Sequence, residues 1–266
     1  MSKKVCSVLA LASFVVVSTV RASPYADSVV AYNPGAGFNP GYTNASVALG
    51  EPSRVNPFGD AVDPFNAPYA TNQLVSIGAN GFLTLQFNTP VLHNMANPFG
   101  IDFIIFGHAG FNITNGNFSG GGITDGSFYT SPAGNTRVSV SADNLNYFIL
   151  NPSLAPNVDG LVPTDGSGNF QKAANPGLVN SDFAGKNLTQ IRALYNGSGG
   201  GAGYNIGWAM GATLPSISYI RIEGLDGNRF IDGVAAVPEP ATWALLLIAA
   251  GLLLPQMHHA RKKTDA

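Results

Sequence analysis

The chain is poor in cysteine, with one among its 266 residues. That residue, Cys6, lies in an apolar N-terminal segment that we expect to be removed, so the mature chain has no cysteine. Many small secreted folds depend on disulfides. Their absence here means that a hydrophobic core of adequate size must stabilise the chain.

Histidine is also scarce. His93 and His108 are the two histidines between residues 23 and 236, and neither belongs to a His-Glu-x-x-His motif or another cluster with metal-ligand spacing. This pattern disfavours a zinc site. No Gly-x-Ser-x-Gly follows an expected strand, which disfavours a serine hydrolase. We therefore predict that the protein is not an enzyme and that both histidines are simply hydrogen-bonded.

Charged residues make up only 11% of the chain. Between residues 23 and 236, seven Lys or Arg stand against thirteen Asp or Glu. Nucleic-acid-binding proteins normally carry a basic face. This mildly acidic segment is therefore not expected to bind nucleic acid.

The N-terminus has the pattern of a secretory signal. Lys3 and Lys4 precede an apolar stretch over residues 5–20, followed by small or apolar residues up to Ala22. This order predicts a signal peptide over 1–22, cut by signal peptidase between Ala22 and Ser23. The remainder would be exported.

The C-terminus contains three blocks: Val237-Pro238-Glu239-Pro240, an uncharged apolar run over 241–254, and Arg261-Lys262-Lys263. A membrane helix needs about 20 apolar residues, so a helix over about 241–257 would span only marginally. Basic residues next to a span stay on the cytoplasmic side, which places the preceding residues outside the cytoplasm.

These blocks, with Trp243 in the apolar run, resemble the PEP-CTERM sorting signal of Gram-negative bacteria. The resemblance implies processing by the membrane protease exosortase near Pro238-Glu239-Pro240. It also implies passage through the inner membrane to the cell surface or extracellular polysaccharide matrix. A plain C-terminal anchor that stays attached is the alternative.

The length and the strand and turn pattern of residues 23–236 predict one all-β domain. We expect a single antiparallel β-sandwich with long Gly-, Pro- and Asn-rich loops. Residues 82–87 alternate, with Leu83, Leu85 and Phe87 on one face. Asn80-Gly81 predicts a hairpin between this strand and one at 74–77. Further strands are expected at residues 101–106, 137–141, 147–150, 204–210, 217–223 and 230–234. Residues 188–195 have helical spacing, with Asn187 placed to cap the first turn.

The order of several central segments is similar to that of bacterial surface proteins with a galactose-binding-like, or discoidin-like, jelly roll. These segments are Ala48-Leu49-Gly50-Glu51-Pro52-Ser53, Gly81-Phe82-Leu83-Thr84-Leu85, Gly100-Ile101-Asp102-Phe103-Ile104-Ile105-Phe106, Val138-Ser139-Val140-Ser141-Ala142-Asp143, Tyr219-Ile220-Arg221-Ile222 and Ile231-Asp232-Gly233-Val234. Gly107 stands where that family usually has a glutamate. The resemblance implies a jelly-roll sandwich.

Calcium is the cofactor that the sequence favours, because secreted sandwiches commonly bind it through loop oxygens. Asp165 and Asn169 belong to one run with oxygen-bearing side chains two residues apart, and an Asx-rich turn is the alternative reading. Glu51 and Asp232 form a second candidate pair if the first and last strands are neighbours. Asp102 interrupts an apolar strand and needs a partner such as Arg221 if it is buried. The alternative is that its face of the strand is exposed to solvent.

The sequence therefore predicts a non-catalytic surface or matrix protein with a role in adhesion or the biofilm matrix. A carbohydrate-binding module is one alternative, because loop aromatics can stack on sugar rings. A glycan hydrolase using two of Glu51, Asp102, Glu223 and Asp232 is the other. The loop aromatics are Tyr25, Tyr32, Phe38, Tyr42, Phe58, Phe65, Tyr69, Phe111, Phe118, Phe128 and Tyr129, whereas Trp208 is expected in the core.

Overall fold

The computed structural model describes residues 23–130 and 134–238. The predicted signal peptide with Ala22 lies outside these ranges. Most of the predicted sorting signal also lies outside them, namely Glu239, Pro240, Trp243, Arg261, Lys262 and Lys263. Within the described ranges, no helix is long and apolar enough to cross a membrane.

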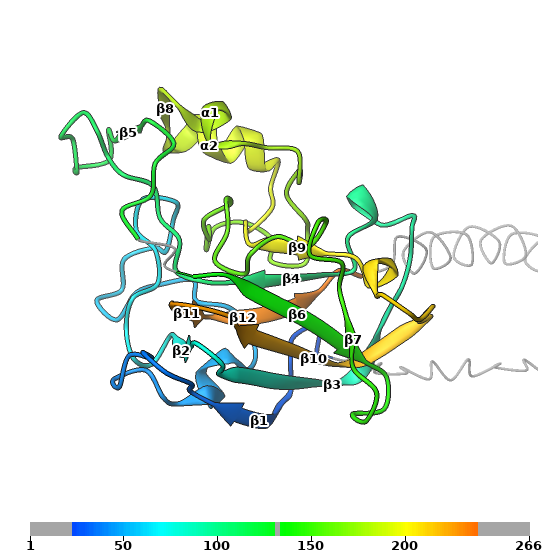
Figure 1. The fold of residues 1–266 in the computed structure, drawn as a ribbon. Helices are drawn as coiled ribbons and strands as arrows, with labels where there is room; N and C mark the ends of the chain where they lie inside the picture. Colours follow the sequence, from blue (N-terminus) through cyan, green and yellow to red (C-terminus); the bar gives the residue numbers. More distant parts are fainter. Residues whose placement is uncertain (1–22, 131–133, 239–266) are drawn as a thin grey trace, which may run out of the picture.

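One layer of the fold is a five-stranded antiparallel sheet in the order β1-β3-β10-β6-β7 (Figure 1). Its strands are β1 (Ser28–Asn33), β3 (Phe82–Leu92), β10 (Ser216–Gly224), β6 (Thr136–Ser141) and β7 (Phe148–Ile149). β3 and β10 are the longest and lie next to each other. They form the middle of this layer.

The opposite layer is built from two smaller antiparallel sheets. The first has the order β12-β4-β9 and the second pairs β11 with β2. Their strands are β12 (Gly233–Ala236), β4 (Phe103–Phe106), β9 (Ala202–Tyr204), β11 (Asn228–Ile231) and β2 (Val75–Gly78). Apolar side chains from both layers form the main core, so the described domain is an all-β sandwich.

The main core takes alternate residues from the long strands. Leu83, Leu85 and Phe87 on β3 are buried in it, as the sequence predicted. Thr84 is buried on the opposite face, where Arg221 Nε donates a hydrogen bond to its hydroxyl over 3.0 Å. Burial on this outer face therefore comes from a neighbouring side chain rather than from the sandwich core.

β4 is buried on both faces. Phe103 and Ile105 contribute to the main core, whereas Ile104 and Phe106 pack with Phe170 in a second cluster. A strand covered on both sides has no exposed face that requires polar residues. This arrangement explains the unbroken apolar run of β4 and confirms the strand predicted at 101–106, which begins at Phe103.

The predicted hairpin at Asn80-Gly81 is wrong in its pairing. The turn is present, with Asn80 at φ 58°. However, β2 pairs with β11, and β3 pairs with β1 and β10. The turn moves the chain from one layer to the other, so the two strands that flank it belong to different sheets.

The predicted strand at 204–210 is also wrong beyond Tyr204. β9 ends there, and residues 206–208 form the 3₁₀ turn η3 (Ile206–Trp208). The Asn205 side chain accepts a hydrogen bond from the Gly207 amide, which favours a turn over an extended strand. Trp208 is partly buried against the main core and the second cluster.

A small helical region covers one side of the sandwich. It contains α1 (Asn180–Phe183), α2 (Leu188–Tyr195) and the short pair β5 (Ile123–Thr124) and β8 (Lys186–Asn187). α2 has the predicted bounds, and Asn187 caps it by accepting from the Gln190 amide over 3.0 Å. The remaining 3₁₀ turns are η1 (Ala45–Ala48) and η2 (Pro98–Gly100).

The loop aromatics divide into two groups. Phe111, Phe128 and Phe65 pack beneath α2 in a third apolar cluster. Phe58 and Phe118, in contrast, are largely exposed. Part of the aromatic content of the loops therefore fixes them to the domain instead of forming a binding surface.

Candidate functional site

The structure brings the segments of Glu51 and Asp232 together but gives the two carboxylates separate partners. Asp232 is buried and accepts hydrogen bonds from the Ser53 amide at 2.8 Å and the Ser53 hydroxyl at 2.7 Å. Burial raises the pKa of Asp232 to about 7. Glu51 pairs with Arg54 at 2.6 Å and accepts a hydrogen bond from the Tyr25 hydroxyl.

Asp165 and Asn169 do not form a shared oxygen cage. The buried Asp165 carboxylate pairs with the Arg192 guanidinium through contacts of 2.7 and 3.0 Å, and also accepts from the Ser167 hydroxyl. The Asn169 side chain accepts from the Gln171 amide. A guanidinium in this position opposes a bound cation, so these residues do not fit a calcium site.

No group of three or more His, Cys, Asp or Glu side chains suited to a metal ion occurs in the part of the chain that the structure describes.

Asp102 is fully buried, and Arg221 is not its partner. Its carboxylate contacts His93 Nδ1 at 2.9 Å and accepts hydrogen bonds from the Asn94 amide, Asn97 Nδ2 and the Ile206 amide. Both sequence interpretations, an ion pair with Arg221 and a solvent-exposed face, are therefore wrong. Asp102 instead ties the segment after β3 to the start of η3.

The second histidine also has a carboxylate neighbour. His108 Nδ1 contacts Asp159, whose other oxygen accepts from the His108 backbone amide at 3.0 Å. The ring lies against Phe230, with 4.5 Å between ring centroids. In the described residues, no serine hydroxyl bonds to either histidine ring, so neither pair forms the relay of a serine hydrolase.

The outer face of the five-stranded sheet carries a different arrangement. The Arg221 guanidinium lies over the Phe82 ring, 4.8 Å from its centroid, and over the Tyr147 ring at 4.4 Å. Its Nε is fixed by Thr84, but the described residues supply no carboxylate partner and no acceptor for its two Nη nitrogens. Thr84, Phe82 and Tyr147 therefore hold the guanidinium in place, and its Nη nitrogens bond to no described residue.

Polar groups surround this guanidinium on the same face. Glu223 forms a forked pair with Arg137 on β6, with contacts of 2.7 and 3.1 Å. Tyr219, two residues before Arg221 on β10, lies opposite Gln86 of β3. The face thus combines aromatic rings with amide, carboxylate and phenol edges.

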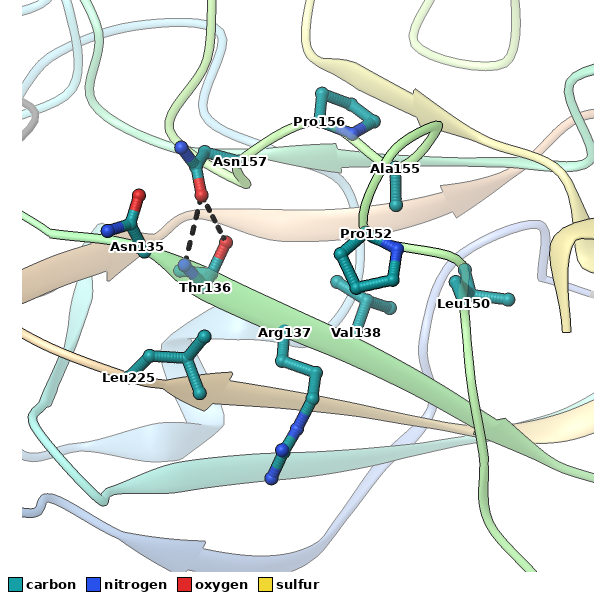
Figure 2. A pocket seen from close by; sticks show the side chains of 10 residues that line it. All are labelled: Asn135, Thr136, Arg137, Val138, Leu150, Pro152, Ala155, Pro156, Asn157 and Leu225. Atoms are coloured by element: carbon teal, nitrogen blue, oxygen red, sulfur yellow. Dashed lines mark hydrogen bonds between the residues drawn. The ribbon is translucent and has the colours of Figure 1, made fainter. Parts of the chain in front are cut away.

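A cavity of about 280 Å³ lies where β6 extends past β7 (Figure 2). Asn157 closes one side of it by accepting hydrogen bonds from the Thr136 amide and hydroxyl. Its lining is formed by Asn135, Thr136, Arg137, Val138, Leu150, Pro152, Ala155, Pro156, Asn157 and Leu225. Val138 and Leu150 in this lining also belong to the main core, and Figure 2 shows the Arg137 side chain pointing away from Asn157 and Pro156. The cavity therefore lies on the other side of β6 from the Arg137 guanidinium.

None of the four acids proposed for glycan hydrolysis lines this cavity. Asp102 and Asp232 are buried, and Glu51 and Glu223 pair with arginines. The structure therefore does not bring these acids together around a common space.

From the sequence, Arg221 was predicted only as a partner for Asp102. Neither Tyr147 nor Phe82 was predicted to contact it. A usable signal existed in the alternation Tyr219, Arg221, Glu223 along one strand, which places three polar or aromatic side chains on one face. What the sequence could not show was that Phe82 and Tyr147 reach the same guanidinium.

Compared with models of known protein families and with curated proteins, the chain shows no match.

Proposed function

We propose that the protein is a non-catalytic, exported surface or matrix protein whose sandwich binds extracellular polysaccharide on the outer face of its five-stranded sheet. The observation that supports this best is the Arg221 guanidinium, held between Phe82 and Tyr147 with its Nη donors unused. Arg donates two parallel hydrogen bonds to a carboxylate. The favoured ligand is thus a polysaccharide that carries carboxylates.

The surrounding groups fit the neutral parts of such a ligand. Phenol, amide and carboxylate edges can exchange hydrogen bonds with sugar hydroxyls. Burial raises the pKa of Tyr147, so its phenol stays neutral; it donates to Asn144 Oδ1 and keeps its oxygen as an acceptor for a sugar hydroxyl.

The proposal includes the delivery route that the sequence indicates. The chain would be exported by its signal peptide, would be held in the inner membrane by the apolar run at 241–254, and would be processed by exosortase at the PEP-CTERM signal. We further propose the jelly-roll topology of the galactose-binding-like family for the sandwich. The strand order, with β10 between β3 and β6, supports a long-range connection of this kind.

Binding of the purified protein to polygalacturonate and to neutral dextran tests the function. We expect binding to polygalacturonate, and Arg221→Ala should weaken it about tenfold, the loss expected for one charge-assisted contact. Arg221→Lys should weaken it less, because it keeps the charge but loses the fork.

Lys186→Ala is the matched control, since it removes one positive charge on β8, outside the five-stranded sheet. It should bind like the unaltered protein. The proposal fails if the unaltered protein binds neither polysaccharide or if Arg221→Ala binds equally well.

A further inference from the structure

Three large apolar side chains are exposed at the end of β3 and in the segment that follows it. Met95 is 72% exposed, Phe99 57% and Leu92 46%. Between Leu92 and Ile101 the one ionisable side chain is His93, which contacts the buried Asp102. This apolar tip, defined as Leu92, Met95 and Phe99, therefore carries no carboxylate of its own.

The apolar tip is held in place from below. Asp102 binds the segment at His93, Asn94 and Asn97. Asn205 Nδ2 also donates to the Gly100 carbonyl over 2.6 Å. The tip is therefore a fixed projection.

Phe99 adopts a left-handed backbone conformation, φ 60° and ψ 13°. That conformation is unfavourable for a bulky residue and persists only where surrounding contacts impose it. Although the backbone is strained, more than half of Phe99 stays exposed.

The described chain ends next to the same segment. The Val237 amide donates a hydrogen bond to the Asp102 carbonyl over 2.9 Å. A cavity of about 180 Å³ has Leu92, Pro24 and Pro238 in its lining, so tip and chain end border one space. Figure 1 shows η2, which carries Phe99, at the end of the sandwich where β12 finishes.

Only Glu239 and Pro240 separate Pro238 from the uncharged run at 241–254. An extended chain covers at most about 3.6 Å per residue, so Pro238 and the first residue of that run are no more than roughly 11 Å apart. If the run lies in a bilayer, this end of the sandwich must lie at the bilayer surface.

We propose that Leu92, Met95 and Phe99 insert into the interfacial layer of the lipid bilayer that holds residues 241–254. The inference rests on the membrane-held intermediate of the proposed function. Uncharged apolar and aromatic side chains are favoured at the boundary between headgroups and acyl chains. The tip and the C-terminal run would then fix the orientation of the sandwich on the membrane.

The full chain suits a single-cysteine experiment, because Cys6 is its one cysteine and can be changed to serine. In that background, Met95→Cys carries a polarity-sensitive fluorophore, and the protein is reconstituted into phosphatidylethanolamine–phosphatidylglycerol vesicles. We expect a blue shift of the emission, and quenching by lipids brominated near the headgroup.

Phe118→Cys is the matched control, since Phe118 is 77% exposed but lies in the loop before β5. Its label should keep the emission of an aqueous probe. Circular dichroism compares both variants with the parent chain, and a third label at Leu92→Cys replaces Met95→Cys if that variant fails to fold.

Vesicle flotation separates the two proposals. If the chain floats but the Met95→Cys label matches the control, the tip proposal is overturned and the anchoring stands. If the chain does not float, the membrane-held intermediate fails, and the tip proposal fails with it. A blue shift that disappears at low protein density would show contact with a second copy and would also overturn the proposal.

Discussion

The pH dependence that Asp232 gives to the stability is opposite to that of most carboxylates, because burial raises its pKa instead of lowering it. Burial raises its pKa to about 7, whereas an unfolded chain has an aspartate pKa of about 3.9. Between these pH values the folded chain keeps a proton that the unfolded chain has released. The free energy of unfolding therefore falls as pH rises through this window, and the contribution is fully present only below about pH 4.

Asp232→Asn tests this pH dependence. The amide can accept from the Ser53 amide and donate to the Ser53 hydroxyl, so it keeps both hydrogen bonds without a titrating group. Between pH 4 and pH 8 the unaltered protein should lose roughly 4 kcal/mol relative to the variant, at 1.36 kcal/mol per pKa unit. Urea denaturation at both pH values measures the free energy of unfolding of the two proteins.

The exposed Asp125 supplies the control. Asp125→Asn should retain the slope of the unaltered protein over the same range, because its neighbours lower the pKa of Asp125 below this window. Identical slopes for the unaltered protein and Asp232→Asn would contradict the assignment.

Asp102 shows which side-chain contacts could not be predicted from the sequence. Asp102 was correctly identified as an acid that needs a partner if buried. Its donors, however, are a histidine and an amide side chain from the preceding segment and a backbone amide about a hundred residues later. Backbone donors leave no sequence pattern, so the sequence indicated only a charged side chain, Arg221, as the partner.

At the scale of elements, local signals predicted local structure. α2 was predicted correctly because its spacing and its cap are properties of nine consecutive residues. The turn at Asn80 was predicted for the same reason. Strand partners were not, because β2 pairs with β11 about 150 residues away, and no short-range pattern encodes that choice.

The Asn187 cap provides a test of element stability. Asn187→Ala removes the acceptor for the Gln190 amide at the start of α2 and should lower the free energy of unfolding by about 1 kcal/mol. Asn187→Ser should restore most of it, since serine is also a good N-cap. Thermal unfolding of the three proteins measures the difference, and an unchanged alanine variant would contradict it.

For the molecule as a whole, the distribution of charge predicts the response to calcium. The described acids considered as ligands already have partners: Asp165 has Arg192, Glu51 has Arg54, and Asp232 has Ser53. Calcium would have to displace these contacts before it gained ligands of its own.

Millimolar calcium or EDTA should therefore leave the midpoint of thermal unfolding unchanged. Magnesium at equal ionic strength is the control for general screening. A rise in the midpoint specific to calcium would restore the cation site that the sequence suggested.

The order of strands in the five-stranded sheet has a consequence for chain synthesis. β3 and β6 are joined only by β10, which begins at Ser216, and the other layer lacks β11 and β12 until residue 236. Non-local pairing of this kind is slow to form and leaves strand edges open in the meantime. A chain that leaves the ribosome or translocon without residues 216–236 would lack β10, β11 and β12. Its β3 and β6 would then have no strand to join them in one sheet.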